Sequence, residues 1–360
     1  MTNLQKLHTN FQQSPWIDNL SRELVESGRL QQFINNGVRG LTSNPTILEN
    51  AIKGSDSYDE KIKEYANIGL SNEEIFFKLA IEDIRASAKL LEPIWHESNG
   101  EDGYVSLEVS PNLADDTEAT IKQAKQLWNE LNLPNLLIKV PATKAGVPAI
   151  RELLGSGINV NVTLIFSLDR YQDVITAFKD THMTGSGNSA RSVASFFISR
   201  VDTETDKRLE AIGTEEAMSL RGKSAVAQAI VAYDIFLDRM GKEAVIDSHG
   251  PSVQRLLWAS TSTKNPAYND LLYVSNLLTP LSINTLPEDT IARILDHLPA
   301  DAKSVTMVDI ENAHKMLAKL KAVGVDMSDV SLVLENEGVE KFKASYASLL
   351  NAIETKKASL

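Results

Sequence analysis

One lysine interrupts a run of residues that is otherwise apolar. Lys139 stands in NLLIKVP, residues 135–141, among leucine and β-branched side chains. Lysine is rarely buried without a partner or a function. Burial disfavours a charged amine, and the neutral amine is the form that condenses with a carbonyl group. We therefore expect Lys139 to be a Schiff-base nucleophile assisted by neighbouring cations. From its position alone, it could equally end a strand and extend its tip to solvent.

Acidic and amide side chains stand where other apolar runs end. Asp18 follows Trp16-Ile17, Glu108 follows Leu107, and Asn44 precedes Pro45. In a parallel barrel, the carboxyl ends of the strands meet at one rim, and active sites lie there. We expect these three side chains to lie close to Lys139.

Two further segments have polar side chains on one face only. In residues 158–164, INVNVTL, Asn159, Asn161 and Thr163 alternate with apolar residues, and Ser106 and Glu108 do so in residues 105–109. Barrel strands turn alternate side chains inward and outward, and the outward face packs on helices. The sequence thus predicts that these five polar side chains face the lumen.

Three residues could bind an anion at the same rim. Ser195 and Arg200 come near the end of the predicted sixth strand, and Lys264 follows the seventh. A hydroxyl and two cations suit a phosphate group. Each residue has an ordinary alternative, since Arg200 could pair with Asp202 or Glu204, and Lys264 could be solvated.

Composition limits the possible functions. The 360 residues include 36 basic and 48 acidic side chains, and the resulting net charge of −12 makes nucleic acid an unlikely partner. There is no cysteine, and the six histidines show no HxH or HExxH spacing, so we expect neither a metal nor another cofactor. No apolar run is long enough for a signal peptide or a membrane span, so we expect a cytoplasmic protein.

The apolar patterns predict repeated β–α units, and eight of the runs are typical of strands. These runs are Pro15–Leu20, Val38–Ser43, Tyr104–Val109, Asn135–Pro141, Ile158–Phe166, Arg191–Arg200, Arg255–Thr263 and Ser282–Leu286. Eight strands predict an α/β protein with a (β/α)8 TIM barrel, in which Lys139 is on the fourth strand.

No composition shift marks a domain boundary, so we expect one domain over residues 1–360, with additional helices inserted around 50–97 and 203–250. Ser71 and Glu74 form a capping-box pattern, and Pro93 indicates the end of that helix. A long helical pattern over 205–240 predicts one or two helices.

Together the motifs resemble the transaldolase family, which belongs to the class I Schiff-base aldolases. They are LTSNPTIL (41–48), SLEVSPNLADD (106–116), LLIKVPATKAG (136–146), INVNVTLIFS (158–167) and ASFFISRVD (194–202). They occur in family order, and the chain length resembles the longer bacterial subgroup. The resemblance implies transfer of a dihydroxyacetone unit between sugar phosphates in the pentose phosphate pathway.

The resemblance also implies a role for each candidate residue. Lys139 would form the imine, Asp18 would take the proton of the C4 hydroxyl, and Glu108 with Thr163 would hold a proton-relaying water. Asn44 and Asn161 would bind the dihydroxyacetone hydroxyls. Ser195 and Arg200 would bind the phosphate. Lys264 stands where many members have an arginine as a second phosphate ligand.

Two other functions remain open at this stage. A fructose 6-phosphate aldolase would share the barrel and the lysine but release free dihydroxyacetone. That group resembles this chain less, because it carries glutamine where Glu108 stands. A non-catalytic barrel that binds sugar phosphates is the second alternative. The sequence does not distinguish a monomer from a homodimer.

Overall fold

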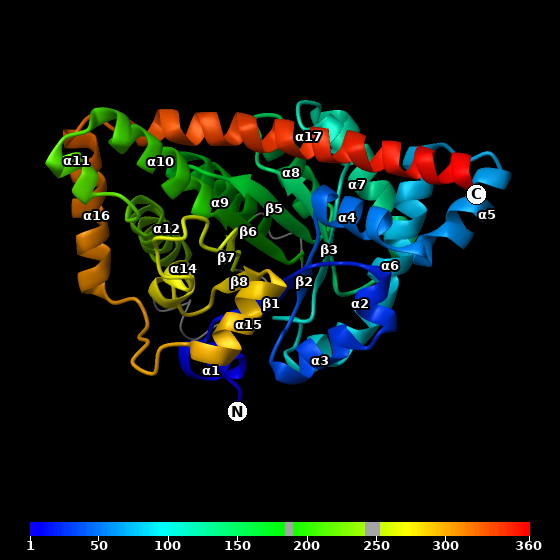
Figure 1. The fold of residues 1–360 in the computed structure, drawn as a ribbon, viewed down its shortest axis with the longest axis horizontal. Helices are drawn as coiled ribbons and strands as arrows, with labels where there is room; N and C mark the ends of the chain where they lie inside the picture. The colour runs from blue at the N-terminus through cyan, green and yellow to red at the C-terminus, as the bar shows by residue number, and fades with distance from the viewer. Residues whose placement is uncertain (184–189, 242–252) are drawn as a thin grey trace.

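The chain forms a closed parallel barrel, as the spacing of its apolar runs predicts. A computed structural model describes residues 1–183, 190–241 and 253–360. Within these residues, eight strands pair side by side in chain order, and β8 pairs with β1 to close the barrel (Figure 1). The strands are β1 (Ser14–Asp18), β2 (Leu41–Thr42), β3 (Val105–Glu108), β4 (Leu136–Pro141), β5 (Val160–Ile165), β6 (Ser192–Phe197), β7 (Arg255–Ala259) and β8 (Ile283–Leu286).

Most of the predicted strands were too long: Val38–Ser43, for example, contains only the two-residue strand Leu41–Thr42. At β6 and β7 the difference affects site residues. β6 ends at Phe197 and β7 at Ala259, so Arg200 lies in the first turn of a helix and Lys264 lies in a loop. Apolar content misled the prediction at β6, because Ile198 is fully buried although its backbone has already turned (φ −106°, ψ −74°). A buried residue at a strand end is therefore not evidence that the strand continues.

Helices surround the barrel (Figure 1). They are α1 (Asn3–Phe11), α2 (Arg22–Glu26), α3 (Arg29–Asn36), α4 (Pro45–Gly54), α5 (Asp59–Asn67), α6 (Asn72–Glu97), α7 (Thr117–Leu131), α8 (Gly146–Gly155), α9 (Leu168–Met183), α10 (Ser199–Ile212), α11 (Glu215–Ser219), α12 (Ser224–Met240), α14 (Leu272–Asn276), α15 (Glu288–His297), α16 (Met307–Ala322) and α17 (Met327–Ser359). No helix in the described ranges is long and apolar enough to cross a membrane.

The structure confirms one predicted helix start and corrects one end. Ser71 caps α6, and Glu74 completes the capping box. The helix does not stop at Pro93 but continues to Glu97. Pro93 is on the exposed side of the helix, where water can replace the hydrogen bond that proline cannot donate.

The segment predicted as one or two helices over 205–240 contains three. Gly213 and Gly222, with φ of +71° and +68°, separate α10, α11 and α12. Positive φ values are readily adopted by glycine and end a helix. The predicted loop at 184–189 and the end of the inserted segment, 242–250, lie outside the described residues.

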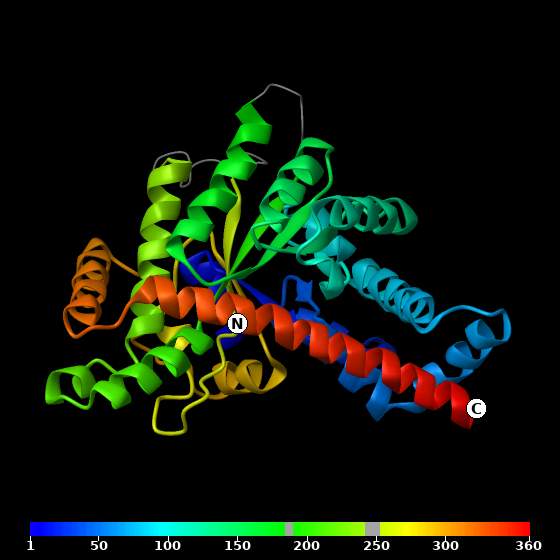
Figure 2. The same ribbon diagram turned by 90° about the horizontal axis from the view of Figure 1, so that it is seen from above.

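The C-terminal helix α17 crosses the whole molecule over the carboxyl ends of the strands (Figure 2). Its buried residues recur mostly every four positions and form one stripe: Val330, Leu334, Gly338, Phe342, Tyr346, Leu349 and Ile353. Gly338 allows a close approach to the barrel, because a Cβ there would lie 3.2 Å from the Phe166 ring and 3.3 Å from Leu164. The helix is thus fixed on the end of β5.

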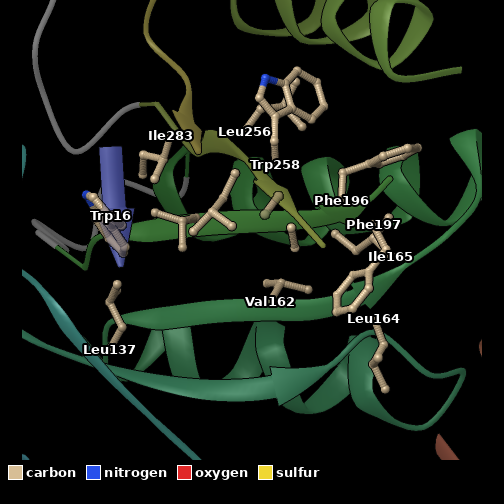
Figure 3. Packing of buried hydrophobic residues seen from close by; sticks show 14 of the residues in the cluster. Trp16, Leu137, Val162, Leu164, Ile165, Phe196, Phe197, Leu256, Trp258 and Ile283 are labelled. Carbon is tan, nitrogen blue, oxygen red and sulfur yellow. The ribbon is translucent and has the colours of Figure 1, made fainter. Parts of the chain in front are cut away.

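Alternation within each strand divides the core into two parts. On β6, Phe196 faces the helices and packs edge-on against Trp258 of β7, with ring centroids 6.3 Å apart (Figure 3). It also packs edge-on against Tyr171 of α9, at 6.1 Å. The next residue, Phe197, faces the opposite way and lines the lumen. Successive side chains of a strand point to opposite faces, so Phe196 contributes to the packing against the helices whereas Phe197 lines the cavity.

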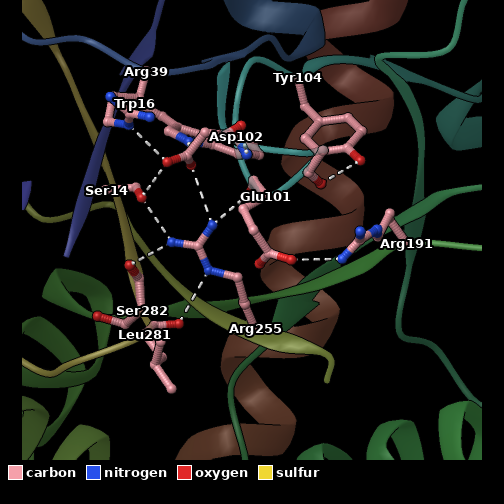
Figure 4. Close-up of polar contacts among 12 residues, drawn as sticks. Ser14, Trp16, Arg39, Glu101, Asp102, Tyr104, Arg191, Arg255, Leu281 and Ser282 are labelled. Atoms are coloured by element: carbon pink, nitrogen blue, oxygen red, sulfur yellow. Dashed lines mark hydrogen bonds and ion pairs between the residues drawn. The ribbon is translucent and has the colours of Figure 1, made fainter. Parts of the chain in front are cut away.

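A buried ion network closes the amino-terminal end of the barrel (Figure 4). Asp102, 1% exposed, accepts hydrogen bonds from Ser14, Trp16, Arg39 and Arg255 at 2.7 to 3.1 Å. Burial opposes ionisation, but the positive charges of Arg255 and Arg39 outweigh it and lower the pKa of Asp102 to about 2. Ionised Asp102 therefore stabilises the fold.

We predict that Asp102→Asn lowers the free energy of unfolding by about 3–5 kcal/mol at neutral pH, because two partly buried arginines lose their buried counter-charge. Since the folded-state pKa lies below the unfolded value of about 3.9, this stability is complete above pH ~4 and is lost as the pH falls towards about 2. Urea unfolding from pH 2 to 7 measures both effects. Glu152→Gln, which breaks an exposed pair with Lys125, is the control and should change stability by less than about 1 kcal/mol.

Candidate active site

A cavity of about 230 Å³ opens at the carboxyl ends of the strands, between the barrel and α17. Most of the predicted site residues line it. Its wall includes Asp18, Thr42, Asn44, Lys139, Thr163, Ser195, Phe197, Arg200, Ser262, Lys264, Thr285, Lys341 and Phe342. A larger hollow lies elsewhere on the surface, and another adjoins this cavity and shares Asp18 with it, so the chemistry of its wall rather than its size singles this cavity out.

Lys139 lies on β4 with its side chain in the lumen and is 5% exposed. Its Nζ donates a hydrogen bond to the Ser43 carbonyl at 2.9 Å and lies 3.2 Å from Glu108 Oε2. On its other side, the Phe342 ring centroid lies 5.8 Å away. The structure corrects one expectation: the charged group in contact with the amine is the Glu108 carboxylate, not a cation. The amine is also held inside the barrel rather than extended to solvent.

Asp18 and Glu108 stand at the ends of β1 and β3. Burial raises the pKa of both carboxyl groups above their ordinary values, although the positive charge of Lys139 opposes the shift. Asp18 also accepts a hydrogen bond from Thr42 at 2.8 Å, which favours its ionised form. Both groups are therefore able to exchange protons closer to neutral pH than an exposed carboxyl group.

Two buried oxygen atoms face this region without a hydrogen-bond partner among the described residues: Thr163 Oγ1 and Glu108 Oε2, the latter only in ionic contact with Lys139. Buried polar atoms normally have a partner, so such atoms need an explanation. Glu108 also lines a small side cavity of about 10 Å³, roughly the room that one water molecule needs.

The backbone beside Thr163 is strained. Leu164 has a φ of +58°, and the register between β5 and β6 shifts between Val162 and Ile165. A left-handed conformation is costly for leucine and persists only where the surrounding structure imposes it. Here Gly338 of α17 packs against Leu164, so the helix that covers the cavity also holds this distortion in place.

The two predicted asparagines differ in their access to the cavity. Asn44 lines the cavity and caps α4, where its Oδ1 accepts a hydrogen bond from the Ile47 amide. Asn161 is fully buried below the wall, donates to Ser106 at 3.1 Å and accepts from Ser195 at 2.7 Å. Ser195 therefore has to rotate its hydroxyl before it can donate to a bound anion.

The two predicted cations reach the cavity from outside the strands, Arg200 from α10 and Lys264 from the loop after β7. Neither alternative for Arg200 is present. Asp202 binds the Ala225 amide and Tyr273, and Glu204 pairs with Arg208. The Arg200 guanidinium instead lies 5.7 Å from the Phe197 ring centroid. Burial together with the charges of Lys341 and Arg200 lowers the pKa of Lys264.

Sequence reasoning missed the contribution of α17, which brings Lys341 and Phe342 into the cavity. The four-residue spacing of apolar side chains after Asp326, the N-cap, would have predicted the helix. Nothing in that spacing indicates which element it covers. Phe197 and Ser262 also line the cavity and were not predicted, although Phe197 lies in the motif ASFFISRVD and Ser262 is two residues before Lys264.

The fold and this cavity define a (β/α)8 barrel enzyme with a lysine-centred site. Residues 15–353 match the family described as Transaldolase/Fructose-6-phosphate aldolase. A protein named Transaldolase from Mycobacterium ulcerans (strain Agy99) is 44% identical over 354 residues, covering 95% of this chain and 94% of that protein. Another of that name, from Mycobacterium tuberculosis (strain ATCC 25618 / H37Rv), is 45% identical over 347 residues, covering 94% and 92%. The chain belongs to the transaldolase/fructose-6-phosphate aldolase family and is an enzyme.

We predict that kcat/KM decreases as the pH is lowered and that the pKa of this decrease lies above ~3.9, the ordinary aspartate value. The reason is that Asp18 must be ionised to accept a proton, and burial raises its pKa. Measuring kcat/KM from pH 4 to 9 tests this. Asp18→Asn should be inactive throughout. Glu108→Gln should be slower by roughly 10²–10⁴-fold but should still lose activity at low pH as the wild type does. If Glu108→Gln no longer lost activity at low pH, the titrating group would be Glu108 instead of Asp18.

Proposed function

We propose that this protein is a transaldolase of the pentose phosphate pathway. It would move a dihydroxyacetone unit from sedoheptulose 7-phosphate or fructose 6-phosphate to glyceraldehyde 3-phosphate or erythrose 4-phosphate. The observation that carries this proposal is the Lys139 amine, buried in the lumen 3.2 Å from Glu108, in one cavity with Asp18. Small sugar phosphates in the cytoplasm are the expected substrates.

The first steps join the ketose to the enzyme. The neutral Lys139 amine attacks the C2 carbonyl to give a carbinolamine, and loss of water leaves a protonated imine. Glu108 supplies and removes the protons through a water held with Thr163, which gives both unpartnered oxygens a function. The protonated imine then acts as the electron sink, so this route needs no metal or other cofactor.

The next steps break and remake one carbon–carbon bond. Asp18 takes the proton of the C4 hydroxyl, the C3–C4 bond breaks, and its electron pair moves to the imine to form an enamine. The aldose phosphate leaves. When the acceptor aldehyde arrives, the enamine attacks its carbonyl carbon, Asp18 returns the proton to the new hydroxyl, and hydrolysis of the imine frees Lys139.

A fructose 6-phosphate aldolase is the second candidate, because the family description includes it. Such an enzyme would protonate the enamine and release dihydroxyacetone. Two observations favour the transferase: a glutamate at position 108, and an aromatic ring over the Lys139 amine that limits access of water. The relatives at 44–45% identity are named Transaldolase.

We predict that borohydride reduction in the presence of fructose 6-phosphate traps an adduct on Lys139, because reduction makes the imine permanent. Peptide mass spectrometry locates the modified residue. Lys139→Met should form no adduct, whereas Lys144→Met, a change of an exposed lysine five residues further on, should leave trapping intact. An unmodified Lys139 in active enzyme would refute the imine.

We also predict that Phe342→Ala raises the release of free dihydroxyacetone relative to transfer by roughly threefold or more, because water gains access to the enamine. The ratio of the two products with fructose 6-phosphate and erythrose 4-phosphate measures this partition. Leu332→Ala truncates an exposed side chain on the same helix, 57% exposed, and should leave the ratio unchanged. Equal ratios in all three proteins would contradict a shielding role.

A further inference from the structure

Three cations from three separate elements line the outer part of the cavity. Arg200 comes from α10, Lys264 from the loop after β7, and Lys341 from α17. The family resemblance implies roles for Arg200 and Lys264 only. Lys341 has no assigned role, and it belongs to the helix that closes the site from above.

Lys341 differs from every other lysine of α17. Lys343 pairs with Asp115 and Glu340, Lys356 with Asp59, and Lys357 with Glu354. Among the residues that the structure describes, Lys341 makes no ion pair. Glu337 is one turn earlier on the same helix, at the spacing that favours a pair, yet the two do not form one.

Arg200 shows the same contrast on α10. Lys207 and Arg208 of that helix both pair with Glu204, whereas Arg200 pairs with none of the described carboxylates. Among the described residues, Lys264 donates a hydrogen bond to the hydroxyl of Ser262, at 2.5 Å, and forms no ion pair. Three cations without a direct ion pair therefore gather at one cavity, with Glu337 near Arg200 and Asp18 near Lys264 as the carboxylates that act on them.

Such a cluster repels itself. All three cations line one cavity, and burial, followed by the positive charges of Lys341 and Arg200, lowers the pKa of Lys264. A dianionic phosphate placed among them would turn this repulsion into attraction, and each cation would contribute a charge-assisted hydrogen bond. Lysine approaches phosphate as a point charge, which suits a group on a flexible stem.

From this arrangement we infer that Lys341 is a third cationic ligand for the substrate phosphate, supplied by the C-terminal helix. This inference rests on the proposed function, since the phosphate would be that of the sugar. It makes α17 part of the binding site as well as its cover, so the phosphate of the bound donor or acceptor holds the helix against the barrel.

The test compares two acceptors at saturating fructose 6-phosphate. Lys341→Met keeps most of the stem and removes the charge. It should raise KM for erythrose 4-phosphate by roughly fivefold to twentyfold, as expected for one exposed charge-assisted contact. KM for unphosphorylated erythrose and kcat should change little. Lys341→Arg should recover most of the loss. Inorganic phosphate, used as a competitive inhibitor, should bind Lys341→Met more weakly by a similar factor.

Two matched variants exclude indirect effects. Glu337→Gln removes a negative charge beside the proposed phosphate, so it should leave KM unchanged or lower it. If Lys341 served only to pair with Glu337, both variants would raise KM alike, and the inference would be overturned. Lys357→Met removes the hydrogen bond that joins the far end of α17 to Asn72 of α6, and an equal effect there would assign the change to helix docking.

The result also separates this inference from the proposed function. A wild-type enzyme without transfer activity or Lys139 trapping would reject the function itself. An active enzyme in which Lys341→Met has the wild-type KM for erythrose 4-phosphate and the wild-type inhibition by inorganic phosphate would reject the role of Lys341 alone.

Discussion

The contact between the Lys139 amine and Glu108 is the constraint on which the site depends. A lysine and a glutamate 3.2 Å apart, each less than 10% exposed, are costly to bury and would weaken the fold if either lost the other. The barrel bears this cost because strands β3 and β4 pair in a register that places Glu108 directly beside Lys139. Both side chains then point to the same side of the sheet, so a proton can pass between them without backbone movement.

The two ends of the barrel use buried charge in opposite ways. At the amino-terminal end, Asp102 is surrounded by donors and has a pKa of about 2, so its charge adds stability. At the carboxyl end, Asp18 and Glu108 have raised pKa values, which means that their charged forms are poorly compensated. A site that exchanges protons needs such incomplete compensation. The network at the opposite end offsets the resulting loss of stability without taking part in the chemistry.

Sequence alone predicted those parts of the site that lie on strands. Alternation identified Glu108, Asn161 and Thr163 as facing the lumen, and an isolated lysine in an apolar run identified Lys139. The prediction failed where the chain leaves a strand. Ile198 is buried although its backbone has already turned, and a buried apolar residue looks the same in a sequence whether it lies in a strand or in a turn. The sequence-based prediction failed again for α17. An apolar stripe along a helix shows that one face is buried, but it does not show which element covers that face. Contacts between segments about 200 residues apart, such as Lys139 with Phe342, have no local signal.

The position of α17 connects substrate selection with protection of the intermediate. Phe342 and Lys341 are adjacent in sequence, and both line the cavity, one beside the amine and the other among the cations. Any movement that lifts α17 would expose the Lys139 amine to water and, at the same time, remove the positive charge of Lys341 from the outer part of the cavity. Because Gly338 of the same helix packs on the strained turn at Leu164, such a movement would also release the distortion beside Thr163. Shielding of the amine, charge at the mouth and placement of Thr163 are therefore coupled through one rigid element.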